Sequence, residues 1–167
     1  IGHEIGHGFD DQGSKYDGDG NLKSWWTEQD RANFEARTES LVSQFNKFEP
    51  LPGLFVNGEL TLGENIGDLG GTAIALKAYR LSLQGKSSPV LDGFTGEERF
   101  FIGNAQSSRL KWRNQIMELI VKTDPHSPDK YRINGVFSNM ADFYKTYHVE
   151  EGDGLYLPAA QRVQIWQ

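Results

Sequence analysis

Residues 1–11 of the chain read IGHEIGHGFDD, and this stretch limits the folds that the chain can adopt. His3 and His7 are four residues apart, and Glu4 follows the first of them. If the stretch is helical, residues four apart lie above one another on the same face. Two imidazole nitrogens can then point at one tetrahedral metal ion, with the Glu4 carboxylate near a water molecule on that ion. The alternative is a solvated helix face, so further ligands must be sought in the rest of the chain.

The third ligand that a catalytic zinc site needs is not in the first helix. The metzincin pattern requires glycine at position 10 and histidine at position 13, and the chain has Asp10 and Gly13 instead. The preferred candidate is Glu64, in the segment LTLGENIGDLGG. Asp68, one turn further on, is placed to accept the second N–H of a ligating histidine and so to fix its tautomer. Without the two histidines, both acids would be read as exposed residues of an amphipathic helix.

Composition limits the class of protein. The chain has 167 residues and a net charge of −6, from 17 basic and 23 acidic side chains, with no long basic run. We therefore expect no nucleic-acid partner, and no membrane segment is expected because no apolar run approaches about 20 residues. There are no cysteines, which excludes disulfides and thiolate ligands. Because the chain begins inside a motif, we expect it to be the C-terminal piece of a longer protein.

Hydrophobic spacing predicts a mainly α fold with few strands. Thr27 and Thr95 are expected to cap helices, the latter in a capping box with Glu98. Ser138 is expected to cap a last short helix, and Leu157 and Trp166 are expected to anchor the tail. The helices are predicted at residues 1–9, 27–48, 61–83 and from 138 to 147, and a further helix is predicted from 95, which itself or through a successor continues towards 121.

Three motifs in order give the chain a resemblance to a known family. They are GHEIGHGFDD (2–11), GELTLGENIGDLGG (58–71) and KTDPHSPDKYRINGVFSN (122–139), and the chain ends with VQIW before its last residue. Together they resemble the neprilysin and endothelin-converting-enzyme family of zinc metallopeptidases. The resemblance implies a mainly α zincin (thermolysin-like) catalytic domain fragment with little β. Residues 1–167 would be its C-terminal part, without the upstream strand region and the large helical domain.

The resemblance also implies the metal site and its catalytic carboxylate. It makes His3, His7 and Glu64 the ligands of one Zn²⁺ per chain. Glu4 would polarise the zinc-activated water and pass its proton to the leaving amine. This is chemically sensible, because zinc lowers the pKa of its water to about 7 and a nearby carboxylate can take the proton.

The remaining roles follow from the same resemblance. Asp68 would orient the first ligand histidine, and Asp10 would serve the second in a similar way. His126 would hydrogen-bond the oxyanion of the tetrahedral intermediate, with Asp124 orienting its ring, and Arg132 would hold a substrate carbonyl. Outside the family pattern, His126 would be an ordinary loop histidine and Arg132 an ordinary surface arginine.

The function implied is zinc-dependent hydrolysis of internal peptide bonds in oligopeptides. The partners would be such peptides and the missing N-terminal part of the same polypeptide. Ser107 and Ser108 depart from the family's aromatic residue at this place, so a preference for large apolar side chains does not carry over. We expect the isolated fragment to be weak or inactive. The lack of cysteine favours a bacterial protein, with an extracytoplasmic (periplasmic or secreted) location.

Two alternatives stay open at this stage. A calcium-binding module could be built on residues 17–28, since positions 1, 3, 5, 7 and 12 of a calcium-loop template are occupied by Asp17, Asp19, Asn21, Lys23 and Glu28. Leu22 argues against it, because it occupies the position where the sharp turn usually requires glycine. The second alternative is a catalytically inert relative that acts as an interaction domain.

Overall fold

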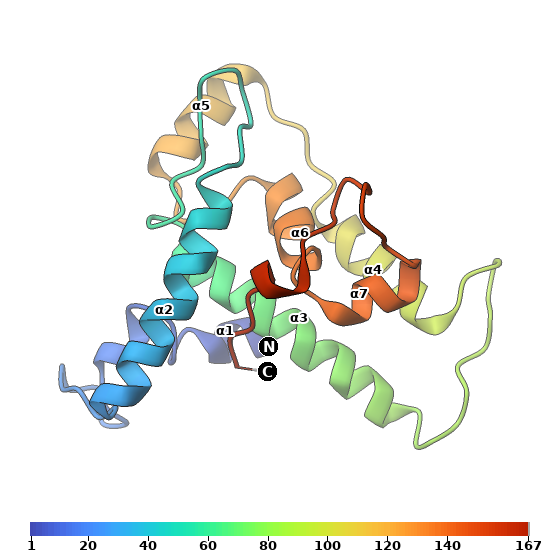
Figure 1. The fold of residues 1–167 in the computed structure, drawn as a ribbon, viewed down its shortest axis with the longest axis horizontal. Coiled ribbons are helices and arrows are strands. Elements are labelled where there is room, and N and C mark those ends of the chain that lie inside the picture. Colours follow the sequence, from blue (N-terminus) through green and yellow to red (C-terminus); the bar gives the residue numbers. More distant parts are fainter. Residues whose placement is uncertain (167) are drawn as a thin grey trace.

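The computed structural model describes residues 1–166, and these residues fold into helices joined by loops (Figure 1). Strand-like contacts within them are limited to three isolated bridges, the first between Tyr16 and Leu22. The expectation of a mainly α fold is confirmed. The α-helices are α1 (Gly2–Gly6), α2 (Glu28–Phe45), α3 (Leu62–Ser82), α4 (Gly96–Ser107), α5 (Asn114–Thr123), α6 (Asp129–Phe137) and α7 (Ala141–Tyr147), and short 3₁₀ turns lie at Gly13–Lys15 and Ala159–Gln161.

Helix α3 lies at the centre of the fold, in green in Figure 1, and α1, α2 and α6 pack against it. One face of α3 joins two apolar clusters. Ile66 belongs to the cluster shared with α2, and Leu69 and Leu76 belong to the cluster shared with α4 and α6. Because α3 is held on several sides, side chains near its N-terminal end have well-defined positions.

Helix α1 is stabilised by its contact with α3 and not by its own sequence. It has five residues, none of them buried, and is poor in helix-forming residues. The backbones of α1 and α3 meet closely, because a Cβ atom at Gly71 would lie 2.7 Å from the backbone nitrogen of His3. A Cβ atom at Gly67 would lie 2.8 Å from Nδ1 of the same histidine. The glycines of α3 therefore allow the histidine-bearing helix to lie directly on it.

Two helix starts match the sequence prediction. Thr27 and Thr95 each accept a hydrogen bond from the backbone N–H three residues on, and each belongs to a complete capping box. The partner of Thr95 is Glu98, as predicted, and the partner of Thr27 is Asp30. Such caps satisfy N–H groups that have no partner within the helix.

Two successive helices, α4 and α5, separated by residues 108–113, occupy the stretch predicted as one helix or as a helix and its successor. The region from 124 to 147 differs from the prediction, because α6 was not anticipated. Ser138 was predicted to start the last helix, and this is wrong, because its hydroxyl donates to the carbonyl of Gly135 at 3.0 Å. Ser138 thus closes α6, and Met140 is the residue before α7.

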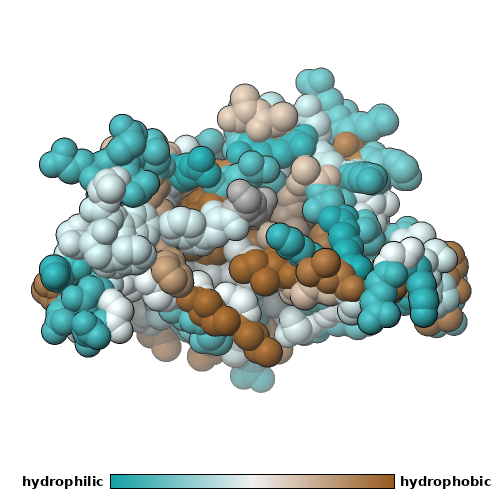
Figure 2. Space-filling model, turned by 90° about the horizontal axis from the view of Figure 1, so that it is seen from below, coloured by the Kyte–Doolittle hydropathy of each residue, from teal (hydrophilic) through white to brown (hydrophobic). Residues whose placement is uncertain are grey.

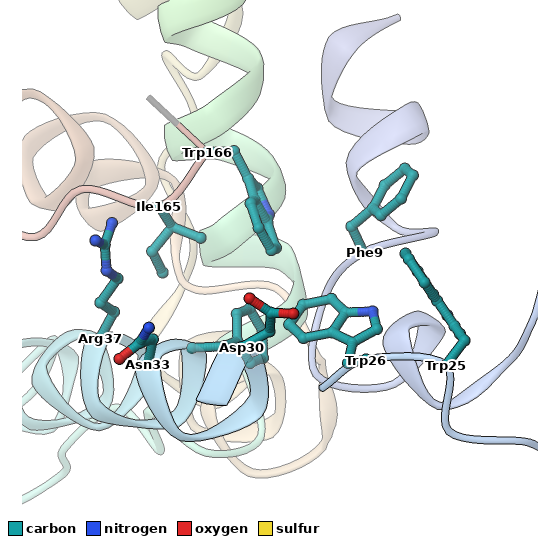
Figure 3. Close-up of a pocket in the computed structure, with 9 residues that line it drawn as sticks. Phe9, Trp25, Trp26, Asp30, Asn33, Arg37, Ile165 and Trp166 are labelled. Carbon is teal, nitrogen blue, oxygen red and sulfur yellow. The ribbon is translucent and has the colours of Figure 1, made fainter. Parts of the chain in front are cut away.

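The C-terminal tail returns to α2. Val163 and Ile165 are buried in the core, whereas Trp166 is 44% exposed and stacks on Phe34 with ring centroids 5.6 Å apart. The predicted anchor Trp166 therefore makes a surface contact, and the tail is anchored in the core by Val163 and Ile165. Together with Phe9, these aromatic rings line a pocket of about 540 Å³ between the end of α1, the start of α2 and the tail (Figure 3).

The surface has exposed apolar side chains as well as charged ones. On the face shown in Figure 2, brown apolar side chains gather in a band between hydrophilic ones. Among residues 1–166, no helix is both long enough and apolar enough to cross a membrane.

Candidate metal centre

Helix α1 presents His3 and His7 on one face. His7 directly follows the helix and keeps helical backbone angles, with φ −60° and ψ −23°. The two imidazole rings are 4.8 Å apart between centroids and nearly perpendicular, at 88°. The spacing of four residues thus gives the juxtaposition that the sequence predicted.

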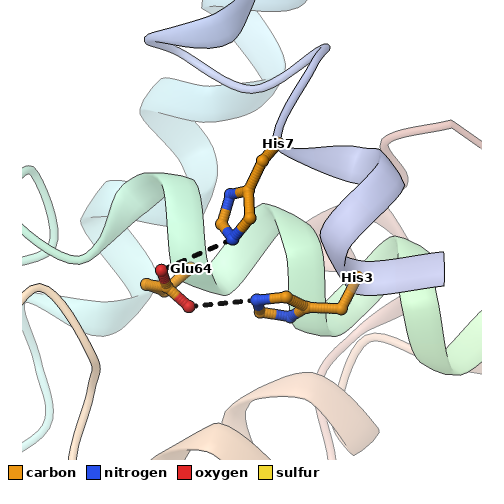
Figure 4. A group of neighbouring side chains, drawn as sticks. All are labelled: His3, His7 and Glu64. Carbon is orange, nitrogen blue, oxygen red and sulfur yellow. Dashed lines mark ion pairs between the residues drawn. The ribbon is translucent and has the colours of Figure 1, made fainter. Parts of the chain in front are cut away.

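Helix α3 brings Glu64 opposite both rings, as Figure 4 shows. Nε2 of His3 lies 3.1 Å from Glu64 Oε2, and Nε2 of His7 lies 3.6 Å from Glu64 Oε1. Each residue can offer one ligand atom such that all three atoms lie within 4.8 Å of one another. Two imidazoles and one carboxylate are the ligands that catalytic zinc sites use.

The environment of Glu64 tests whether a cation fits here. Its Oε2 atom is buried and accepts no well-oriented hydrogen bond from the described residues. Nevertheless, Nε2 of His3 lies 3.1 Å from it, and Nε2 of His7 lies 3.6 Å from the other oxygen, Oε1. Nδ1 of each ring donates to a carboxylate, so a neutral ring directs the lone pair of Nε2 towards Glu64. Lone pairs facing one another across about 3 Å are repulsive, and a cation between them removes the repulsion. The residues present fit a zinc ion.

Asp68 joins the first histidine to Arg132. Its Oδ1 atom accepts from Nδ1 of His3 at 3.0 Å and from Nη2 of Arg132 at 2.8 Å, and its Oδ2 atom accepts from Nε of Arg132 at 2.7 Å. Burial would raise the pKa of Asp68, but these hydrogen bonds outweigh it and hold the pKa below its usual range. The hydrogen bond to Asp68 likewise raises the pKa of His3, against the opposing effect of burial.

Asp10 makes the equivalent contact with the second histidine. Nδ1 of His7 donates to Asp10 Oδ2 at 2.8 Å. The other oxygen of Asp10 accepts the backbone N–H groups of Gln12 and Gly13, each at 2.8 Å. Because Asp10 is buried and held by three hydrogen bonds, it fixes the ring of His7 in one orientation.

His126 and Arg132 reach the same place from the α5–α6 loop and from α6. Nδ1 and the backbone N–H of His126 both donate to Asp124 Oδ1, at 2.7 and 2.9 Å. Burial acts to raise the pKa of Asp124, but these bonds prevail and lower it. Nη2 of Arg132 lies 3.8 Å from Glu64 Oε2. The imidazole of His126 and the guanidinium of Arg132 therefore both border the candidate metal site.

The other predicted residues are less closely engaged. Glu4 lies on α1 between the two histidines and its side chain is exposed. Ser107 ends α4, and its hydroxyl donates to the carbonyl of Asn104 at 2.7 Å.

The calcium alternative gains no support. The carboxylate of Asp17 accepts the backbone N–H groups of Asp19 and Asn21, each at 3.0 Å, as in an ordinary turn. Within residues 1–166, the cluster of three or more groups able to hold a metal is that of His3, His7 and Glu64.

Sequence reasoning missed two residues that border the site. Ser127, next to His126, donates from its hydroxyl to Oδ1 of Asn65, next to Glu64, at 2.8 Å. The two positions are 62 apart in the chain, and each reads alone as an ordinary polar residue. Their only signal is that each directly follows a predicted site residue.

A histidine pair presented by one helix, packed on a second helix that brings a carboxylate opposite both rings, is the arrangement of a zincin-type metallopeptidase domain. The comparison with known families is more specific. The chain belongs to peptidase family M13, whose model matches residues 1–163. The resemblance to neprilysin and the endothelin-converting enzymes is thereby confirmed.

Relatives and solved structures agree with this assignment. Human neprilysin is 36% identical over 172 residues, which cover 99% of this chain and 22% of neprilysin. Neprilysin-11 of Caenorhabditis elegans is 43% identical over 152 residues, covering 88% of this chain and 18% of that protein. The crystal structure of the Mycobacterium tuberculosis zinc metalloprotease ZMP1 with an inhibitor superposes with a TM-score of 0.97 at 52% identity, covering 99% of this chain and 26% of that one. The chain thus spans about a fifth of the length of the curated relatives it matches.

Proposed function

We propose that the protein carrying this chain is a zinc-dependent endopeptidase that hydrolyses internal bonds of oligopeptides. The observation that carries the proposal is the partly buried Glu64 carboxylate, on which the Nε2 atoms of His3 in α1 and of His7 directly after it converge at 3.1 and 3.6 Å. Membership of peptidase family M13 supports the reaction class.

In this proposal His3, His7 and Glu64 hold one zinc ion. When bound, the ion supplies Lewis acidity, which lowers the pKa of water to about 7 and polarises a carbonyl. Asp68 and Asp10 keep Nδ1 of each histidine protonated, so that Nε2 keeps its lone pair for the metal.

The remaining residues act on the peptide. The Glu4 carboxylate accepts a proton from the attacking water and returns it to the leaving amine nitrogen as the C–N bond breaks. Nε2 of His126 donates to the carbonyl oxygen as that oxygen gains negative charge, and such donors are worth about 3 kcal/mol of barrier. Arg132 holds a further carbonyl of the peptide backbone and is itself fixed by Asp68.

The domain assignment is part of the same proposal. Residues 1–167 form the C-terminal part of the catalytic domain, and an N-terminal part of the same polypeptide completes the peptide-binding cleft. The isolated fragment is then weak or inactive. A bacterial, extracytoplasmic protein remains the prediction, and similar chains of known structure include that of a Lactobacillus PepO at 34% identity.

The test is zinc content per chain by elemental analysis, on the full-length protein and on its Glu64→Ala variant. We expect about one zinc ion in the wild type and much less in the variant, because a three-residue zinc shell loses a ligand. Glu59→Ala is the matched control, since Glu59 is exposed at the turn before α3 and lies outside the proposed shell. Hydrolysis of an internally quenched oligopeptide is measured alongside.

The outcomes separate the proposal from its rivals. A wild-type protein without zinc after reconstitution overturns the metal site. Equal zinc in both proteins overturns Glu64 as the third ligand. Full zinc content without hydrolysis of any peptide in a library supports the inert relative instead.

A further inference from the structure

The loop that carries His126 changes from exposed to buried within one residue. The side chain of His126 is 44% exposed, whereas Ser127 is 2% exposed and Pro128 is also buried. A serine is seldom so completely buried unless its hydroxyl has a partner. The base of this loop is therefore fixed inside the protein while the imidazole stays accessible.

The hydroxyl of Ser127 begins a chain of hydrogen bonds that runs from α3 to the turn before it, and the first two of these bonds are buried. It donates to Asn65 Oδ1 at 2.8 Å, and Nδ2 of Asn65 donates to Thr61 Oγ1 at 3.0 Å. The Thr61 hydroxyl donates in turn to the backbone carbonyl of Asn57 at 3.0 Å. Asn65 and Thr61 are only 1% and 3% exposed, so water does not replace these bonds.

The direction of this chain follows from its last member. The carbonyl of Asn57 can only accept, so the Thr61 hydroxyl must use its one proton there. Thr61 Oγ1 then accepts from the amide nitrogen of Asn65, which turns Oδ1 of Asn65 towards Ser127. The carboxamide is thus locked in one orientation before Ser127 meets it.

The two residues joined by this bond are neighbours of two proposed site residues. Asn65 follows the proposed zinc ligand Glu64, and Ser127 follows the proposed oxyanion donor His126. Nε2 of His126 lies 3.0 Å from Glu64 Oε2. We infer, on the basis of the proposed function, that the buried Ser127–Asn65 hydrogen bond positions the imidazole of His126 relative to the metal-binding face of α3, where the substrate's oxyanion would form.

The other contacts of His126 do not perform this task. Asp124 is two residues away in the same loop, so it orients the ring within the loop but does not fix the loop to α3. The contact between Nε2 and Glu64 is the one that metal and substrate would replace. Arg132 joins α6 to α3 through Asp68, several residues beyond the loop. Ser127 is the residue that ties the base of the loop itself to α3.

The test is a double-mutant cycle on the full-length protein, with Ser127→Ala, His126→Ala and the double variant. We expect Ser127→Ala to lower kcat about 10-fold with little change in KM, because small misplacements of catalytic groups cost up to about 10²-fold. His126→Ala is expected to lower kcat by about 10²–10³-fold. In that background Ser127→Ala should change kcat by less than about 2-fold, since it acts through a ring that is no longer present.

Matched variants separate positioning from stability. Ser138→Ala removes another buried hydroxyl, which donates to Gly135 at the far end of α6, and should keep kcat. Ser127→Thr retains the hydroxyl and should keep most of the activity. Amide hydrogen exchange of residues 124–128 should accelerate in Ser127→Ala but not in Ser138→Ala, while zinc content stays the same. If Ser127→Ala does not fold, Thr61→Val removes the acceptor for Asn65 and should lower kcat in the same direction by a smaller factor.

The contrary results are distinct. If the wild type is active and Ser127→Ala keeps the wild-type kcat, this inference is overturned and the proposed function stands. The same conclusion follows if Ser127→Ala lowers kcat equally in the wild-type and the His126→Ala backgrounds. A kcat loss in Ser138→Ala as large as in Ser127→Ala also overturns it. An inactive wild-type protein overturns the proposed function and this inference together.

Discussion

Replacing Asp68 by asparagine tests how the site is held together. The substitution preserves shape, but it removes the charge and one acceptor from a residue that receives three hydrogen bonds. Both carboxylate oxygens are used, one by His3 and Arg132 together and the other by Arg132 alone. An amide has only one oxygen, so in either orientation its NH₂ group must face a donor.

The expected loss can be worked from these contacts. Partners that orient metal-ligating histidines contribute about 10–100-fold in metal affinity. That corresponds to about 1.4–2.8 kcal/mol. If the amide oxygen faces His3, its NH₂ group faces Nε of Arg132 and the arginine loses its paired contact. If the oxygen faces Arg132 alone, the ring of His3 loses its acceptor and its orientation.

The assay is zinc affinity of the full-length protein by competition with a chelator of known affinity. We expect Asp68→Asn to bind zinc 10–100-fold more weakly than the wild type, which is a loss of about 1.4–2.8 kcal/mol of binding free energy. Asp142→Asn is the matched control, because Asp142 also accepts from an arginine, Arg80 at 2.7 Å, on α7 away from the site. An Asp68→Asn protein that binds zinc as tightly as the control would refute the role of Asp68 in orienting His3.

Three further predictions concern other parts of the molecule. Glu4→Gln should keep its zinc and lower kcat by about 10²–10⁴-fold in peptide hydrolysis, and an active variant would remove Glu4 as the proton carrier. Gly71→Ala should destabilise the protein by about 1–3 kcal/mol in thermal unfolding, because the added Cβ atom meets a backbone nitrogen of α1. Gly103→Ala is the control: the space around Gly103 is open, so this change should stabilise α4 by up to about 1 kcal/mol. The hydrogen bond from Arg80 lowers the pKa of Glu97, so the pair stabilises the fold above about pH 4.5 and loses its effect as the pH falls through the lowered value. The Tm difference between wild type and Glu97→Gln, small because the pair is partly exposed, should therefore shrink between pH 7 and pH 3, and a constant difference would contradict this.

The sequence predicted those features that depend on short-range pattern. Spacing of four residues predicted that His3 and His7 share a face, and the capping box at Thr95 was found from two residues three apart. The position of Glu64 opposite the histidines was also anticipated, from its motif. Each of these depends on local geometry or on a motif with a known chemical use.

Features that depend on tertiary contact were not predictable. Helix α6 is short and mixes polar with apolar residues, so its periodicity was hidden, and Ser138 was assigned to the wrong helix. The link between Ser127 and Asn65 depends on how a loop meets a helix 62 residues away. The burial of Ile165 rather than Trp166 likewise depends on the path of the tail over α2.

The glycines of α3 place a limit on how far this site can be stabilised. A glycine within a helix costs about 0.5–1 kcal/mol relative to alanine, so each is an obvious target for making α3 more robust. At Gly70 an added Cβ atom would make an ordinary 3.8 Å contact with Trp166, and the helix can accept the change. At Gly67 and Gly71 the added atom would enter His3 itself. Thermal robustness and a correctly placed ligand histidine are therefore in opposition at these two positions, and a stabilised variant must gain its stability elsewhere in the fold.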